Sequence, residues 1–451
     1  MRRTLIHGAQ VVVGSPERAK AETMDILVDG ERIAALGRDI AAPDAEIVDG
    51  SGRIVIPGLV NAHMHTWQTA LRGMAYNSNL LDYLQRIHGK LAGLYRPDDI
   101  YIGNLAGALN QIACGTTTLG DWSHNNPTPE YTDAAVSALH ESGIRAVFLH
   151  GTPRAAPGSG AGVPLHPRSE LERLLKGRFA QSDGLLSLGM AIPGPLYSPA
   201  EVAMADFRLA KELDLIVSMH HSSPPPPGTN PWAALEAANL LGTNVNIVHG
   251  NHMRDDQLKR LVDRGATFTV TPEVEMTDGH GHPLTGRLIA LGDAPSIGID
   301  IESSISGEML TAARIALVHQ RALDHTRAYN ESNPYDFRTP ICAGEALAWA
   351  TIHGARALGL ERRVGSIEVG KQADLVVIDA RLLNLSPVHD PVTAALQASL
   401  ANIEAVMIAG EWRKRDGRLV YAGLAALQAS LAESASRLAA GVPEKNKVGP
   451  G

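Results

Sequence analysis

Two histidines that follow a short apolar run are the first residues of this chain whose type and spacing could do chemistry. The run is IVIPGLVNAHMHTWQTALRG, residues 54–73, and it sets His63 and His65 two positions apart. On an extended strand, side chains two apart point to the same side and lie about 6.5–7 Å from each other. Both imidazoles can therefore reach one small ion, while Met64 packs on the other side.

Other metal-compatible side chains stand where further apolar runs end. His220 ends DLIVSMH, His249 ends NVNIVH and Asp300 ends APSIGID. His221 follows His220 directly, so either could be the ligand, although the phase of the strand favours His220. Such a set is hard to explain as core packing, because each member stands at a strand end. The pattern therefore predicts a metal site.

Histidine nitrogens with one carboxylate and an open coordination position suit Zn²⁺, with Fe²⁺ as the rival. Such an ion lowers the pKa of its bound water from about 15.7 towards 7 and so supplies hydroxide at neutral pH. A carboxylate beside that water can take its proton and later return it to a leaving group. These residue types therefore predict a metal-bound hydroxide with a carboxylate beside it that can carry its proton.

The elements that must position these residues alternate between strands and helices. Helical stretches separate most of the expected strands, which are the opening run and residues 116–122, 144–150, 185–192, 214–220, 244–249, 266–271 and 294–300. Eight such units predict an α/β fold, a (β/α)₈ TIM barrel, whose active site lies at the carboxyl ends of the strands. An open doubly wound sheet is the alternative, and the lack of G-x-G-x-x-G after the first strand weakens it.

Two β-rich segments flank this middle part. Residues 1–57 and 362–424 both alternate apolar and polar residues between Gly and Asp-Gly turns. We expect them to form one small β-sandwich domain built from both chain termini, with two independent hairpin units as the alternative. The barrel is then expected over residues 58–361, and a C-terminal helix with a polar tail over 425–451.

Composition excludes several classes of partner. The 451 residues carry a formal net charge of −8, so no electropositive face for nucleic acid is expected. No apolar run approaches the length of a membrane span, and no signal peptide is recognised. Two cysteines provide no disulfide framework. We expect a cytoplasmic homo-oligomer that acts on a small-molecule substrate and water.

The motifs together resemble those of the amidohydrolase superfamily. The resemblance rests on PGLVNAHMH, the strand ending in His220, VHG with His249, Asp300 after SIGI, and the closing GSIEVGKQADLVVID. The branch it indicates is cytosine-deaminase-like, with the triazine hydrolases and the adenosine and methylthioadenosine/S-adenosylhomocysteine deaminases. No lysine ends the fourth strand, so the binuclear arrangement around a carboxylated lysine is not expected.

This resemblance implies a ligand set and two catalytic roles. The divalent ion, Zn²⁺ or Fe²⁺, is held by His63, His65, His220 and Asp300. His249 then hydrogen-bonds the attacking water or the developing oxyanion, and Asp300 carries the proton. The implied reaction is hydrolysis of a C–N bond (amide, amidine or ring-amino) in a small cyclic nitrogen compound. The alternatives are a dehalogenating or dealkylaminating triazine-type hydrolase, and a non-catalytic barrel scaffold.

One departure from the family pattern concerns the general acid. Deaminases of this branch carry His-x-x-Glu after strand five, and here Ser223 stands where that glutamate is expected. A serine is a poor acid at neutral pH, so we expect little deamination of cytosine, guanine or adenosine. Substitute acids are sought in TPEVEMTDGHGHP, where Glu273 is favoured over Glu275, His280 and His282 because it lies just past the strand end and is expected to face the site.

The substrate pocket is expected near the first ligands and after strand five. Trp67, Gln68 and Arg72 follow the first two histidines and are predicted to line it, together with Ser223.

The purified protein should hold close to one transition-metal ion per chain, measured by elemental analysis. Replacing His63 or Asp300 with alanine should remove the metal or abolish turnover, because each supplies one of four ligands. Full activity in a chelated, metal-free sample would disprove the metal site.

Overall fold

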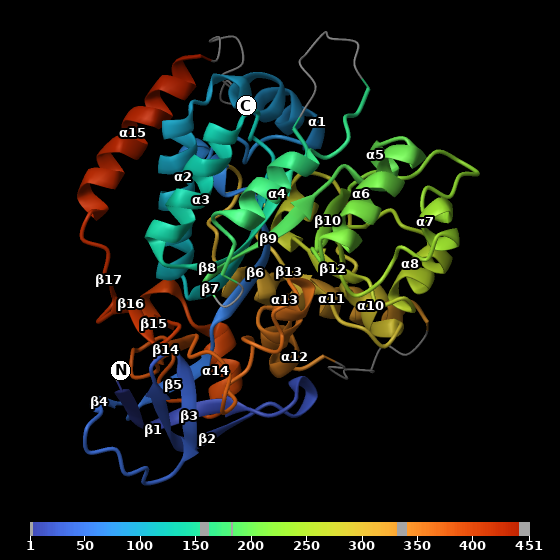
Figure 1. The fold of residues 1–451 in the computed structure, drawn as a ribbon. Helices are drawn as coiled ribbons and strands as arrows, with labels where there is room; N and C mark the ends of the chain where they lie inside the picture. The colour runs from blue at the N-terminus through green and yellow to red at the C-terminus, as the bar shows by residue number, and fades with distance from the viewer. Residues whose placement is uncertain (1–2, 154–161, 182–183, 332–340, 442–451) are drawn as a thin grey trace.

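An eight-stranded parallel sheet forms the centre of the molecule. The computed structural model describes residues 3–153, 162–181, 184–331 and 341–441 (Figure 1). Neighbouring strands pair in the order β13-β12-β11-β10-β9-β8-β7-β6. Their bounds are β6 Leu59–Met64, β7 Thr116–Ser123, β8 Arg145–Gly151, β9 Leu186–Ala191, β10 Val217–His221, β11 Val245–His249, β12 Thr267–Val270 and β13 Ser296–Ile297. Residues of β7 and β8 are buried along their whole length, as expected for strands covered on both faces.

The first and last strands meet at a short seam that nearly closes the sheet into a barrel. Met64 and Asp300 form a parallel bridge, with the Asp300 N–H donating to the His63 carbonyl at 3.0 Å and the His65 N–H donating to the Asp300 carbonyl at 2.7 Å. Gly298 allows this approach, because a Cβ there would lie 2.7 Å from the His63 carbonyl oxygen. The predicted eight-stranded parallel barrel is confirmed.

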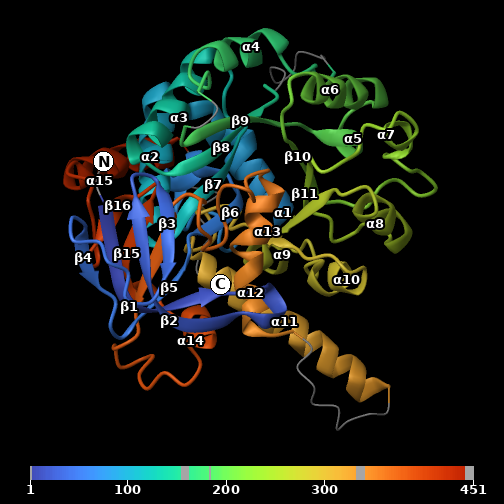
Figure 2. The ribbon, with the colours of Figure 1, turned by 60° about the horizontal axis from the view of Figure 1, so that its bottom comes forward.

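Helices surround the barrel and follow its strands (Figure 2). The longer ones are α2 Pro97–Ala113, α3 Pro129–Ser142, α4 Arg168–Lys176, α6 Ala200–Glu212, α8 Asp255–Val262 and α11 Met309–Asn330. Shorter helical segments are η2 Thr66–Leu71, α1 Leu80–Tyr83, η3 Leu84–Leu91, η4 Ala92–Leu94, α5 Gly194–Tyr197, α7 Ala233–Ala237, α9 Pro272–Thr277, α10 Thr285–Ala290, α12 Ala343–Trp349 and α13 Ile352–Ala357. Local sequence sets these limits: α3 begins with a proline and is followed directly by Gly143, which adopts the left-handed conformation. Within the described chain, no helix combines the length and apolarity that crossing a membrane requires.

A second, nine-stranded sheet combines both ends of the chain (Figure 1). Its order is β17-β16-β15-β14-β5-β1-β2-β3, with β4 paired to β1. The bounds are β1 Arg3–Val13, β2 Lys20–Asp29, β3 Arg32–Gly37, β4 Glu46–Asp49, β5 Arg53–Pro57, β14 Leu375–Asp379, β15 Ile403–Ile408, β16 Glu411–Arg415 and β17 Arg418–Leu419. The antiparallel pairing of β5 with β14 joins the two segments into one sheet, so they are not two separate hairpin units.

Four further helical segments accompany this sheet or the chain end: η1 Pro16–Arg18, α14 Pro391–Gln397, η5 Leu400–Asn402 and α15 Leu424–Ala440. The helix expected near the C-terminus is α15, which lies along α2 (Figure 1). Ser434 on α15 donates to Asp99 on α2 at 2.7 Å, and Arg437 pairs with the same carboxylate. The predicted polar tail, residues 442–451, lies outside the described residues.

A buried ion pair ties the sheet to the barrel. Arg145, the first residue of β8, donates to both carboxylate oxygens of Asp374, at 2.8 and 3.0 Å, and to Gln372 at 3.2 Å. Both charged side chains are 2% exposed. The Asp374 carboxylate also accepts from the Ala409 N–H at 2.8 Å. Removing one charge would leave the other buried without its partner.

Replacing Asp374 with alanine should lower the free energy of unfolding by about 3–5 kcal/mol, because the Arg145 guanidinium would stay buried and unpaired. Chemical unfolding followed by circular dichroism measures this change. Glu212→Ala is the matched control, since it removes an exposed partner of Arg168 and should leave the transition almost unchanged. Equal effects of the two variants would show that the buried pair does not anchor the nine-stranded sheet to the barrel.

Candidate metal centre

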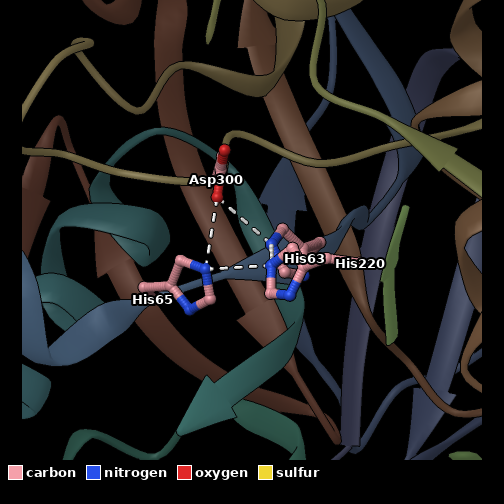
Figure 3. A group of neighbouring side chains, drawn as sticks. All are labelled: His63, His65, His220 and Asp300. Carbon is pink, nitrogen blue, oxygen red and sulfur yellow. Dashed lines mark hydrogen bonds and ion pairs between the residues drawn. The ribbon is translucent and has the colours of Figure 1, made fainter. Parts of the chain in front are cut away.

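Four side chains converge at the carboxyl end of the barrel strands (Figure 3). His63 and His65 come from the end of β6, His220 from β10, and Asp300 from the segment after β13. Their ligand atoms all lie within 4.8 Å of one another. The His220 Nε2 lies 3.3 Å from the His63 Nε2 and 3.2 Å from the His65 Nε2. The Asp300 Oδ1 lies 3.2 Å from the His63 Nε2 and 3.4 Å from the His65 Nε2.

The His65 ring is oriented by a bond on its far side. Its Nδ1 lies 2.8 Å from the Trp122 carbonyl oxygen, which can only accept a hydrogen bond. Nδ1 therefore carries the proton, and the Nε2 lone pair faces the cluster. A backbone carbonyl in this position is a frequent outer partner of metal-binding histidines, because it fixes both tautomer and orientation.

The protonation states of the cluster fit a metal ion. Burial, followed by the charge of His63, lowers the pKa of His65 to about 3, and burial also holds the pKa of His220 well below its ordinary value. Burial raises the pKa of Asp300, but His63 and the neighbouring histidines outweigh it and hold the carboxyl ionised. Neutral imidazoles and a carboxylate are the forms that bind metals. The four residues have the composition and spacing of a site for one divalent ion.

His249 stands beside this cluster rather than within it. Its Nε2 lies 3.9 Å from the Asp300 Oδ2. Both residues have positive φ, +70° for His249 and +65° for Asp300. Backbone strain of this kind at non-glycine residues is concentrated at functional sites, where it aims side chains. Here it occurs at the two strand ends that face the cluster.

Glu275 holds the outer edge of the His249 ring. The His249 Nδ1 lies 3.3 Å from the Glu275 Oε1, which also accepts from the Thr271 N–H at 2.9 Å. Asn251 donates to the other oxygen at 3.1 Å. Burial lowers the pKa of His249, but the bond to Glu275 and the charges of Asp300 and Glu275 outweigh it and raise the pKa. Glu275 was considered from the sequence only as a substitute acid, and its pairing with His249 was missed.

His221 points away from the metal cluster. Its ring stacks on Trp232, with centroids 6.2 Å apart and planes 11° apart. Both ring nitrogens are buried without a hydrogen-bond partner among the described residues. The structure therefore distinguishes the two adjacent histidines, between which the sequence left the choice open. Of the two, His220 faces His63 and His65.

A cavity of about 390 Å³ opens beside the four ligands. Its apolar wall includes Leu80, Tyr83, Trp122, Ile192 and Val274. The polar side chains lining it include His88, His124, Thr152, Ser222, Ser223, Asp278 and His280. An apolar cavity with a few polar groups around a reactive centre is typical of small-molecule sites.

Of the four side chains predicted to line the pocket, one lies in the cavity wall and three do not. Ser223 lines the cavity, whereas Trp67, Gln68 and Arg72 lie outside its wall. Trp67 is buried, with its ring 5.0 Å from that of Tyr95. Gln68 donates to the hydroxyl of Tyr83 at 2.7 Å and so supports a wall residue from behind. Arg72 pairs with Glu302, which is buried and which the sequence did not identify as its partner.

Glu273, the favoured substitute acid, also lies outside the cavity wall. Its side chain is half-buried, and burial together with the charge of Glu308 raises its pKa to about 6. The carboxyl group from this segment that does line the cavity belongs to Asp278. The sequence offered no signal for this residue beyond its position in the loop after strand seven.

Residues 54–413 match the model of the amidohydrolase family. The chain belongs to the amidohydrolase family. Among relatives, the 5-methylthioadenosine/S-adenosylhomocysteine deaminase of Symbiobacterium thermophilum is 28% identical over 93% of this chain and 94% of its own length. The 8-oxoguanine deaminase of Pseudomonas aeruginosa is 28% identical over 92% of this chain and 95% of its own length.

A solved structure shares the whole architecture of this amidohydrolase. An adenosine deaminase from Xanthomonas campestris, crystallised with bound zinc, superposes with a TM-score of 0.84 at 24% identity, covering 97% of this chain and 98% of the other. At this identity the likeness shows a shared fold. The predicted superfamily is confirmed, and so is the prediction of an enzyme that hydrolyses C–N bonds other than peptide bonds.

His220→Ala should lose most of the bound metal, because it removes a ligand nitrogen that faces His63 and His65. His221→Ala should keep the metal, because that ring stacks on Trp232. Elemental analysis of both purified variants measures the difference, with circular dichroism to verify folding. Metal loss in the His221 variant alone would show that the two adjacent histidines have been assigned the wrong way round.

Proposed function

We propose that this amidohydrolase uses one zinc ion to hydrolyse an amide, amidine or ring-amino C–N bond of a small nitrogen heterocycle. The observation that supports the proposal most is the convergence of His63, His65, His220 and Asp300 beside a largely apolar cavity. The relatives named above are deaminases of purine compounds, which agrees with a flat heterocyclic substrate.

Zinc fits the donor set best. Three imidazole nitrogens and one carboxylate oxygen are borderline-soft ligands, and they leave room for a water in a site of low coordination number. A divalent ion held there would lower the pKa of a bound water and so supply a nucleophile at neutral pH.

Asp300 is proposed as the proton carrier. Its carboxylate is ionised, and its Oδ2 faces the side of the cluster where His249 stands. It can accept a proton from the attacking water and return it to the departing nitrogen, which must leave as ammonia or an amine.

His249 is proposed to stabilise the negative charge that develops on the oxygen bonded to the attacked carbon. Because Nδ1 is held by Glu275, Nε2 is directed towards Asp300 and the cavity. The raised pKa of His249 favours the imidazolium form, which donates from both nitrogens. A fixed, buried donor of this kind contributes most where charge develops in the transition state.

The proposal also covers the form of the second sheet. We infer that the nine-stranded sheet folds over its own core as a small sandwich, since one apolar cluster combines residues of β1 and β2 with residues of β14, β15 and β16. The predicted domain limits 1–57 with 362–424, 58–361 and 425–451 stay predictions. So do the cytoplasmic location and the homo-oligomer.

The zinc-loaded protein should release ammonia or an amine from at least one member of a panel of aminopurines, aminopyrimidines, aminotriazines and cyclic amides. The panel includes 5′-methylthioadenosine and 8-oxoguanine. His249→Ala should retain zinc but lose about 10²–10³ in turnover, the scale of losing one oxyanion donor. Zinc-replete protein that hydrolyses no member of the panel would contradict the proposal, and loss of zinc in the variant would make His249 a ligand.

A further inference from the structure

Asp278 is a buried residue of the cavity wall whose carboxyl group is unpaired. The residue is 2% exposed, and neither of its carboxyl oxygens has a hydrogen-bond partner among the described residues. It lines the cavity together with His249, His280 and Asp300. Its backbone is fixed on both sides, because its N–H donates to the Val274 carbonyl at 2.8 Å and its own carbonyl accepts from the Leu80 N–H at 2.9 Å.

Such a group is costly to the fold. A buried polar side chain without a partner loses its hydration and gains nothing in return, and a buried charge loses more. Native structures contain few such groups, and each calls for a cause. Asp278 lines the substrate cavity beside the metal cluster, so a group on a bound substrate can supply the partner that its carboxyl lacks.

The position after strand five at which related deaminases carry the glutamate of His-x-x-Glu holds no acid in this chain. Ser223 lines the cavity, and its hydroxyl accepts a hydrogen bond from the Tyr197 hydroxyl at 3.4 Å, but a serine is a poor acid at neutral pH. Glu273 lies outside the cavity wall. Asp278 and Asp300 are the carboxylic side chains that line the cavity in the described part of the chain, and Asp300 belongs to the metal cluster.

We propose that Asp278 is the general acid of this enzyme, protonating the ring nitrogen next to the attacked carbon in place of the missing glutamate. This inference rests on the proposed function and names its substrate class: heterocycles with an amino group on a carbon adjacent to a ring nitrogen. It reverses the expectation that Ser223 makes the chain a poor deaminase.

The surroundings of Asp278 favour its protonated form near neutral pH. Burial, followed by the negative charge of Asp300, raises the pKa of Asp278 to about 7, while His249 opposes the rise. His249 ends β11 and Asp300 follows β13, the two strands that flank β12, and His280 stands two residues away from Asp278 on the same loop. The acid form is therefore populated below about pH 7 and is lost as pH rises through that value.

The proposed hydrolysis conserves every proton and electron pair. The oxygen of water bonds to the ring carbon, Asp300 takes one proton of that water, and the C=N electron pair moves to the ring nitrogen, which takes the proton of Asp278. The exocyclic C–N bond then breaks, and the nitrogen leaves as ammonia with the proton held by Asp300. The remaining hydroxyl proton restores Asp278 as the ring C=O forms.

Asp278→Asn tests this role, because the amide keeps the size and a donor but cannot transfer a proton. The experiment uses zinc-loaded protein and the aminopurine or aminopyrimidine that the unmodified enzyme turns over fastest. We expect kcat to fall by about 10²–10⁴, KM to change little and zinc content to stay equal. The fall of kcat/KM above about pH 7 should also disappear. Difference infrared spectroscopy at pH 6 should lose one protonated carboxyl band.

Asp206→Asn is the matched control. Asp206 is also buried and has a pKa raised to about 6 by burial, but it lies on α6 outside the cavity and accepts from the His166 N–H at 3.1 Å, a bond that asparagine can keep. This variant should retain kcat and the pH profile. An equal fall of kcat in both variants would indicate a structural effect and would overturn the assignment of Asp278 as the general acid.

Other outcomes separate this inference from the proposed function. Unchanged kcat and an unchanged alkaline limb in Asp278→Asn would overturn the inference, as would loss of that limb in Glu273→Gln instead. An enzyme that hydrolyses cyclic amides but no ring-amino compound would also overturn it while leaving the proposed function in place. Zinc-replete protein without any hydrolysis would contradict the proposed function itself.

Discussion

The backbone pairing between Asp300 and the end of β6 is the interaction on which the site depends. The same two hydrogen bonds that bring the last strand to the first, Asp300 N–H to His63 carbonyl and His65 N–H to Asp300 carbonyl, also set the carboxylate against two imidazoles. The contact that closes the barrel therefore also fixes the positions of these ligands. Gly298 is part of it, since any side chain there would collide with the His63 backbone.

The surrounding structure keeps this seam in place from both sides. Trp122 on β7 holds the outer edge of His65, and Glu275 on α9 holds the outer edge of His249. Farther out, the Arg145–Asp374 pair fixes the nine-stranded sheet to the barrel at the opposite, amino end of β8. A rigid scaffold with polar groups concentrated at one end of the strands is the general design of barrel enzymes.

The strand ends could be predicted from the sequence because periodicity and apolar runs fix them directly. His63, His65, His220, His249 and Asp300 all stand where an expected strand stops, and the structure brings them together. The pocket wall could not be predicted in this way. Trp67, Gln68 and Arg72 follow the ligands in sequence, but η2 turns the chain inward, so that Trp67 and Gln68 become buried supports. The position of Asp278 depends on where α9 ends and on the hydrogen bond that its carbonyl accepts from the Leu80 N–H, and neither is indicated by the sequence pattern.

Two carboxyl groups line one cavity, and their surroundings shift their pKa values in opposite directions. Asp300 lies among histidines that stabilise its negative charge, so it is ionised and can receive a proton. Asp278 is buried without a hydrogen-bond donor and lies within the field of Asp300, so it tends to keep its proton. Pairs of titratable groups whose environments separate their pKa values mark the acid and the base of a site. Burial is the larger of the two causes that raise the pKa of Asp278, so its capacity to act as an acid follows first from its place in the cavity wall.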